Sequence, residues 1–325
     1  MKKILALLVV LGVFLSCNTN VKATVQMDWV IIGDAGNLAD DNGYGSVDRA
    51  YQISKYELTA TQYAEFLNAV AVTDMYGLYN PDMWTSEYGC KIQKSGSPGS
   101  YSYSVASDYA KRPVNYVSFW DACRFANWLH NGQGDGDTEI GAYTLTTDGI
   151  SNNTVTRNPD ALVFIPTEDE WYKAAYYKGG GTNTGYWDYP TGTDSLPSNE
   201  LIDPDPGNNA NFYQDGYTIG SPYWRSEVGK FEDSASPYGT FDQGGNVWEW
   251  NETITDLPYR GIRGGAFNYV GNLQASSRYS TDPTFELDNF GFRVAQVPEP
   301  CTIILLALGG LALRKKQYSF RREVK

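Results

Sequence analysis

Few side chains in this sequence have the types and spacing that catalysis needs. The 325 residues include one histidine, His130, so there is little basis for a Ser-His-Asp triad, a Cys-His pair or a multi-histidine metal centre. No glycine-rich loop follows a strand with phosphate-binding spacing. Glu168 and Glu170 could in principle act together on glycosides. A helix-capping role with Thr167 explains them more simply, and we expect His130 at a solvated helix end.

The elements that would position these residues are short. Apolar stretches predict strands at residues 29–32, 50–53 and 162–165. Apolar residues at helical spacing predict three helices, and each follows a hydroxyl residue that can cap it. These caps are Thr59, Ser118 and Thr167, and two of them are answered three residues later by Asp121 and Glu170.

Long loops should connect these elements. Aromatic residues make up 14% of the chain, and 33 Gly and 15 Pro interrupt it at short intervals. Residues 71–111, 131–160 and 179–220 are rich in turn-forming residues and lack helical periodicity. We find no internal repeat and no linker between the two ends of the chain. The sequence therefore predicts one α+β domain, at residues 24–297, with little regular secondary structure.

The N-terminus has the pattern of a secretory signal peptide. Two lysines precede an apolar run at residues 4–15, which is too short to span a membrane comfortably. Small residues before Thr24 offer a cleavage site, so residues 1–23 are expected to be removed. The alternative is a lipoprotein modified at Cys17. Both alternatives export the protein to the cell envelope or the extracellular space.

The C-terminus, residues 298–325, has a second targeting pattern. VPEP at residues 297–300 precedes a 13-residue apolar run and then a basic cluster that starts at Arg314. A helix of that length spans about 20 Å, less than the hydrocarbon core of about 30 Å. The order of motif, apolar run and basic cluster resembles PEP-CTERM sorting signals, which implies export and sorting machinery as partners and transient membrane association. A marginal transmembrane helix with a positive inner flank is the alternative.

The charge of the remaining chain limits its partners. The precursor carries −13, and removal of the nine positive and two negative charges of the two ends leaves −20. Such a surface repels nucleic acid and anionic lipid, and it favours cations or neutral ligands.

Two cysteines, Cys90 and Cys123, remain between the two ends of the chain. In an oxidising compartment they could form a disulfide. Cys123 also falls on the apolar face of the second predicted helix, where a free thiol would pack as a small hydrophobic group. The sequence leaves both possibilities open.

Six motifs recur here in the order seen in the formylglycine-generating enzyme (sulfatase-modifying factor) family. They are YELT at 56–59, RPV at 112–114, IPTE at 165–168, GNVWEW at 245–250, RGG at 263–265 and GFR at 291–293. The chain resembles this family over roughly residues 28–296. The resemblance implies a formylglycine-generating-enzyme-like fold, related in its broad plan to C-type lectins, with long loops.

The same resemblance argues against the family's oxidase chemistry. The positions of its copper-binding cysteine pair fall at about Tyr269 and Gln274, and a Cu(I) site of this kind needs thiolates. A second branch, the sulfoxide synthases, uses several histidines around iron. We therefore expect no copper, and an exported non-catalytic binding or envelope-structural protein that recognises a peptide, glycan or envelope protein. The alternative is a divergent enzyme on this scaffold.

Structural calcium is the one cofactor that the resemblance implies. One site maps onto Asn211, the carbonyl of Phe212, Asp215 and the carbonyl of Tyr217. The other maps onto Asp242, the carbonyls of Gly245 and Val247, and Glu249. Mixed oxygen ligands suit calcium, which accepts about 6–8 of them. Solvated loop acids are the simpler alternative for Asp242 and Glu249.

Overall fold

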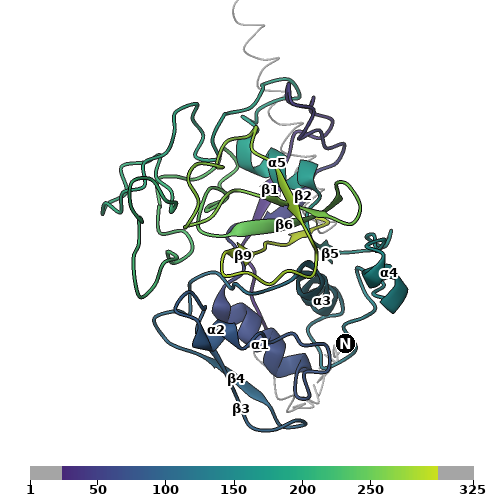
Figure 1. The fold of residues 1–325 in the computed structure, drawn as a ribbon. Coiled ribbons are helices and arrows are strands. Elements are labelled where there is room, and N and C mark those ends of the chain that lie inside the picture. The colour runs from purple at the N-terminus through teal and green to yellow at the C-terminus, as the bar shows by residue number, and fades with distance from the viewer. Residues whose placement is uncertain (1–23, 299–325) are drawn as a thin grey trace, which may run out of the picture.

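The computed structural model describes residues 24–298, in which helices and strands are short and loops are long (Figure 1). Both targeting segments predicted above therefore lie outside the described residues, apart from Pro298. Within residues 24–298 no helix is long and apolar enough to cross a membrane.

A four-stranded antiparallel sheet joins the beginning and the end of the described chain. Its strand order is β1 (Trp29–Ile32), β2 (Tyr51–Ser54), β10 (Ala295–Gln296) and β5 (Val163–Phe164). β1 and β2 match the first two predicted strands to within one residue. β5 is only two residues long, shorter than the predicted strand at 162–165.

A second four-stranded sheet carries the GNVWEW and RGG motifs. Its strand order is β8 (Tyr279–Thr281), β7 (Arg260–Arg263), β6 (Trp248–Ile254) and β9 (Phe290–Gly291), and β9 runs parallel to β6. A separate hairpin is formed by β3 (Ile92–Ser95) and β4 (Ser102–Val105). Figure 1 shows this hairpin with α1 and α2 at one end of the molecule.

The three predicted helices are confirmed, and their caps explain where they begin. They are α1 (Ala60–Val70), α3 (Phe119–His130) and α5 (Glu168–Tyr176), and each starts with a capping box. Two short helices, α2 (Asp82–Thr85) and α4 (Thr147–Ser151), were not predicted. His130 ends α3, and its Nδ1 accepts a hydrogen bond of 3.0 Å from the backbone N–H of Leu162. The expected helix-end role of His130 is thus confirmed.

Aromatic rings form much of the core between the helices and the sheets. Phe66 of α1 contacts Phe125 and Trp128 of α3 at centroid distances of 5.4 Å, and Phe125 also contacts Phe292 of the GFR motif. Such buried pairs contribute about 0.5–1.5 kcal/mol each beyond their buried area. The GFR motif therefore contributes a side chain, Phe292, to the hydrophobic core.

Residues 177–247 contain no helix or strand, as the turn-rich sequence predicted. Hydrogen bonds to a buried carboxylate replace regular structure there. Asp205 accepts four, from the side chains of Ser234 (2.7 Å) and Asn209 (2.6 Å) and from two backbone N–H groups. Figure 1 shows these loops gathered beside the β6 sheet.

The possible disulfide between Cys90 and Cys123 is not formed, because both cysteines are free and buried. Burial raises the pKa of both thiols. The charge of Arg225 lowers the pKa of Cys90, whereas the largest charge effect on Cys123 comes from Arg260, which lowers its pKa. The two thiols therefore have different surroundings. Cys123 packs in α3 as a small apolar side chain, which was the second possibility.

Candidate functional site

The acidic residue of the GNVWEW motif forms a buried ion pair. Both oxygens of Glu249 accept hydrogen bonds from Arg293 of the GFR motif, at 2.5 Å from Nε and 2.7 Å from Nη2. The indole N–H of Trp171 donates to the same carboxylate at 2.7 Å. Both members of the pair are 0% exposed. This ion pair joins β6, the chain before β10 and helix α5.

Two further carboxyl groups lie close to this ion pair. Glu57 is buried and accepts hydrogen bonds from Asn246 Nδ2 (2.6 Å) and from the backbone N–H of Val247 (3.2 Å). Burial, with repulsion from Asp242 and Glu249, holds the pKa of Glu57 well above its usual value. Burial is also the main cause that raises the pKa of Asp242 to about 6. Both carboxyl groups therefore keep their protons to a higher pH than they would in the unfolded chain.

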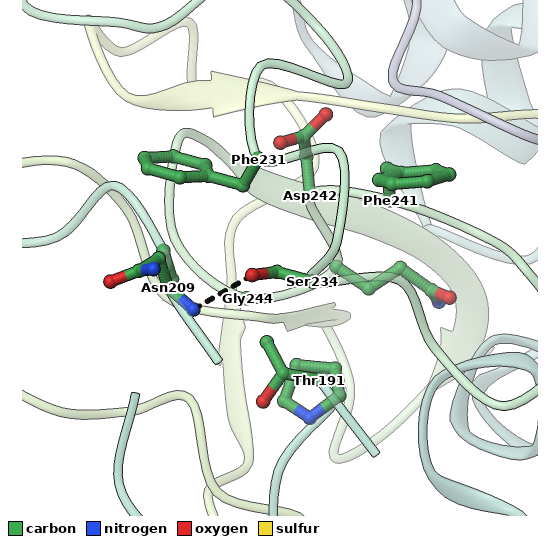
Figure 2. A pocket seen from close by; sticks show the side chains of 10 residues that line it. Thr191, Asn209, Phe231, Ser234, Phe241, Asp242 and Gly244 are labelled. Carbon is green, nitrogen blue, oxygen red and sulfur yellow. Dashed lines mark hydrogen bonds between the residues drawn. The ribbon is translucent and has the colours of Figure 1, made fainter. Parts of the chain in front are cut away.

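Asp242 borders a very small cavity. Figure 2 shows the Asp242 side chain with Phe231 and Phe241 at this cavity, together with the hydrogen bond from the backbone N–H of Asn209 to Ser234. The cavity volume is about 10 Å³, close to the space that one water molecule needs. One oxygen of Asp242 accepts a hydrogen bond of 2.6 Å from Gly229 N–H. Nothing larger than a single water or ion fits beside this carboxyl group.

Calcium at the second predicted site stays a prediction, because one of its four ligands, Glu249, is engaged by another cation in this arrangement. Asp242, Gly245, Val247 and Glu249 are close in sequence, but both oxygens of Glu249 are already bonded to Arg293. Within residues 24–298 no three His, Cys, Asp or Glu side chains are grouped so as to hold a metal ion. The cation that Glu249 binds here is a guanidinium.

The first predicted calcium site fits in part. The side-chain oxygen of Asn211 is buried and has no hydrogen-bond partner among the described residues, so it is free to bind a cation. The carbonyl of Phe212, in contrast, accepts a hydrogen bond of 3.0 Å from Thr218 Oγ1. Asp215 and Tyr217 follow in an exposed turn. Calcium at this site stays a prediction, and it would depend mainly on Asn211.

Glu168 and Glu170 have structural partners rather than a shared catalytic geometry. Glu168 is 2.7 Å from Arg263 Nη2 and 2.8 Å from Arg278 Nε. Glu170 pairs with Arg157 at 2.8 Å and also accepts the backbone N–H of Thr167 in the capping box. The predicted capping role of Glu170 is confirmed.

An aromatic surface lies where three loops meet. We define it as Tyr88, Tyr213, Tyr217 and Trp224, with Phe267 buried beneath them. Neighbouring rings in this set have centroids 4.9–6.5 Å apart. Tyr217 is 43% exposed, so part of the cluster faces solvent. This surface was not predicted from the sequence, although four aromatic residues occur between positions 213 and 224.

Backbone strain and unpaired donors occur at the same place. Trp224 has φ = 60°, a left-handed conformation that is rare for a bulky residue and costs on the order of 1–3 kcal/mol. Its buried indole N–H has no partner among the described residues, and the same is true of Nε and Nη2 of the fully buried Arg225. Local strain of this kind is typical of binding and switching regions.

The two positions at which the family resemblance places the copper-binding cysteines, about Tyr269 and Gln274, lie in different surroundings. The carbonyl of Tyr269 accepts a hydrogen bond from Tyr213 N–H (3.2 Å), so Tyr269 adjoins the surface. Its ring is 43% exposed and packs against Trp248 with centroids 5.6 Å apart. Gln274 donates a hydrogen bond to Tyr189 Oη (2.7 Å). The side chains at these two positions are thus an aromatic ring and an amide.

Several known proteins are similar to this chain in sequence or in fold. The profile of the family described as sulfatase-modifying factor enzyme 1-like domain matches residues 32–298. The formylglycine-generating enzyme of Mycobacterium tuberculosis (strain ATCC 25618 / H37Rv) is 28% identical over 222 residues, which are 63% of this chain and 64% of that enzyme. The chain thus matches less than two thirds of that relative's length.

Two solved structures have related folds. Treponema denticola variable protein 1 has a TM-score of 0.50 and 22% identity, with 83% of this chain and 95% of that chain covered. The crystal structure of CarF has a TM-score of 0.49 and 20% identity, with 84% and 99% covered. Likeness at this level concerns the fold alone. The expected mixed α+β fold with long loops is confirmed.

Proposed function

Because this chain belongs to the sulfatase-modifying factor enzyme 1-like domain family, we propose that it uses the family scaffold for binding rather than for oxidation. It would be an exported, non-catalytic protein of the cell envelope that recognises a partner through the aromatic surface. The observation that carries this proposal is the pair Tyr269 and Gln274 at the positions of the redox cysteines. The remaining thiols, Cys90 and Cys123, are buried.

The composition of the aromatic surface supports a binding role. Tyrosine and tryptophan offer large contact areas at low entropic cost, and they are enriched at binding hot spots. Asp215 and Glu87 are exposed in the same loops as Tyr217 and Tyr88. An aromatic surface with acidic neighbours suits a neutral or cationic partner, such as a glycan or a basic peptide segment.

A pair of matched variants tests the role of this surface. Tyr217→Ala removes an exposed ring of the surface, and Tyr259→Ala removes a ring of almost equal exposure, 44%, in a turn outside it. Purified protein should be tested for binding to glycan and peptide arrays and to envelope fractions. We expect Tyr217→Ala to weaken binding at least tenfold and Tyr259→Ala to leave it unchanged. Equal loss in both variants would contradict the proposal.

An oxidation assay separates binding from catalysis. The purified protein should leave a cysteine-containing peptide unchanged when copper and oxygen are supplied, because it lacks the thiolate pair that would bind Cu(I). Turnover of the peptide would favour the alternative, a divergent enzyme of this family.

Export is tested on the native protein. Mass spectrometry of envelope fractions should find a mature N-terminus at Thr24 and no residues beyond about position 298. An intact C-terminal basic cluster would contradict processing, and a lipid-modified Cys17 would support the lipoprotein alternative.

A further inference from the structure

A cavity far larger than the one beside Asp242 lies between the end of β2, the start of α1 and two loops. Its volume is about 330 Å³, at the lower end of the range of about 300–1,000 Å³ for small-ligand sites. Its walls include Met27, Asp28, Tyr56, Glu57, Lys111 and Val228. None of these residues belongs to the aromatic surface, so the cavity is a separate feature.

Backbone contacts hold the walls of this cavity in place. The N–H of Val228 donates to the carbonyl of Lys111 at 2.9 Å, and the N–H of Lys55 donates to the carbonyl of Asp28 at 2.7 Å. Gly229 has φ = +70°, and a Cβ there would be 2.5 Å from the ring of Tyr56. Only glycine allows this close approach, which fixes the Tyr56 ring as one wall. The cavity is therefore preformed by the fold.

Most polar groups at the cavity are already used by the protein. Thr59 and Gln62 bond to each other in the capping box of α1, and Ser54 Oγ donates to the carbonyl of Tyr56 at 2.9 Å. Glu57 is held by Asn246 and Val247 at the buried end. The groups left for a ligand are on residues nearer the solvent.

Two charged groups at the cavity remain for a ligand, the carboxylate of Asp28 and the ammonium of Lys111. Asp28 and Lys111 are both exposed, and neither forms an ion pair with another described residue. Glu57 is engaged by Asn246 and Val247 at the buried end, so the charged groups nearest the solvent are the carboxylate of Asp28 and the ammonium of Lys111. Met27, the Tyr56 ring and Val228 supply apolar wall between them.

We propose that this cavity binds a small zwitterion of the α-amino acid class. The carboxylate of Asp28 receives the ligand's ammonium group, and the ammonium of Lys111 receives its carboxylate. The side chain of the ligand lies against Met27, Tyr56 and Val228, so an aliphatic amino acid fits best. A ligand with only one charge would leave either Asp28 or Lys111 without a partner.

Calorimetry with L-leucine and its two half-molecules tests this assignment. 3-Methylbutylamine lacks the carboxylate, and 4-methylpentanoate lacks the ammonium group. We expect the purified full chain to bind leucine at least about tenfold more tightly than either half, because charge-assisted hydrogen bonds are the strong ones. Half-molecules that bind as tightly as leucine would overturn the zwitterion assignment. If leucine, alanine and glycine give no heat of binding at millimolar concentration, the cavity is not an amino-acid site.

Variants that remove the charge of Asp28 or Lys111 test whether leucine binds in this cavity. Asp28→Asn and Lys111→Gln change exposed side chains without ion-pair partners, so their urea midpoints should equal that of the parent protein. Each variant should lower the affinity for leucine at least about tenfold. Asp41→Asn, which also changes an exposed aspartate, should bind leucine normally, as should Tyr217→Ala. Leucine binding that survives in both cavity variants would refute the proposed contacts, whereas failure of the aromatic-surface tests would leave this result unaffected.

Discussion

The buried ion pair between Glu249 and Arg293 provides the most direct test of the structural reasoning. Glu249→Gln keeps the size of the side chain but removes its charge. Arg293 would then remain fully buried, with the carbonyls of Ser54 and Phe241 as hydrogen-bond partners at 3.1 and 2.8 Å. The nearby carboxyl groups of Glu57 and Asp242 are not hydrogen-bonded to it and would have to ionise to replace the lost charge. A buried cation that loses its counter-charge is strongly destabilising, because water is not present to solvate it.

The expected loss follows from the number and burial of the contacts. Glu249 accepts two hydrogen bonds from Arg293 and one from Trp171, and both charged groups are 0% exposed. Removal of one member of such a pair costs about 3–5 kcal/mol. Total domain stabilities are about 5–15 kcal/mol, so this single amide should remove a large fraction of the stability.

Urea denaturation followed by tryptophan fluorescence measures this loss as a shift of the midpoint at constant m-value. The control is Lys230→Gln, which breaks a partly exposed ion pair with Asp203 at 3.7 Å and should cost less than about 1 kcal/mol. If Glu249→Gln costs no more than the control, the ion pair does not hold these elements together. Glu249 would then be available for the predicted calcium site.

Three further predictions concern protons, calcium and thiols. Folding favours protonated Asp242, whose pKa rises from 3.8 to about 6, so stability should fall as pH rises between these values and then level off. Asp242→Asn should remove this part of the pH dependence and gain up to about 3 kcal/mol at pH 7, measured as urea midpoints from pH 4 to 8. If the first calcium site forms, Tm should be higher in calcium than in chelator, and Asn211→Ala should abolish the difference; equal Tm values would refute the site. The mature chain should show two reactive thiols when unfolded without reductant and none when folded, and a count of zero after unfolding would restore the disulfide.

Local signals in the sequence were sufficient for the helices. Thr59, Ser118 and Thr167 each cap a helix as predicted, because capping depends only on residues within one turn. The strands of the second sheet were not predicted. β6 begins with four consecutive buried residues and therefore lacks alternation, and β9 has only two residues, too few for a period.

The contacts of the candidate site could not be derived from spacing. Arg293 and Glu249 are 44 positions apart, and neither motif contains a local pattern that predicts the contact with the other. Tyr88, Trp224 and Phe267 come from three separate loops, so their cluster depends on the fold rather than on a local pattern. A cavity depends on residues that are far apart in the sequence, which explains why the cavity lined by Asp28 and Lys111 was not predicted.

The family motifs supply folding contacts in this chain. Glu57 holds the start of β6, Glu168 binds Arg263, and Glu249 binds Arg293, so the charged residues of five of the six motifs are engaged inside the protein. Arg112 of the sixth motif donates to the carbonyl of Arg225. Each of these residues would be needed whether or not the protein catalysed a reaction. Membership of the family therefore specifies the scaffold, and our proposal for the function rests on positions outside the motifs.

Two positions outside the motifs, Tyr269 and Gln274, carry our proposal of a binding function. Tyr269 adjoins the aromatic surface through its backbone, while Trp224 stores strain in the neighbouring loop. A loop segment without helix or strand can exchange its side chains with little cost to the scaffold, because the motifs carry the stabilising ion pairs elsewhere. At position 269, where the family resemblance places a copper-binding cysteine, this chain has a tyrosine that adjoins the aromatic surface. This placement is the reason we propose a binding function rather than a divergent reaction.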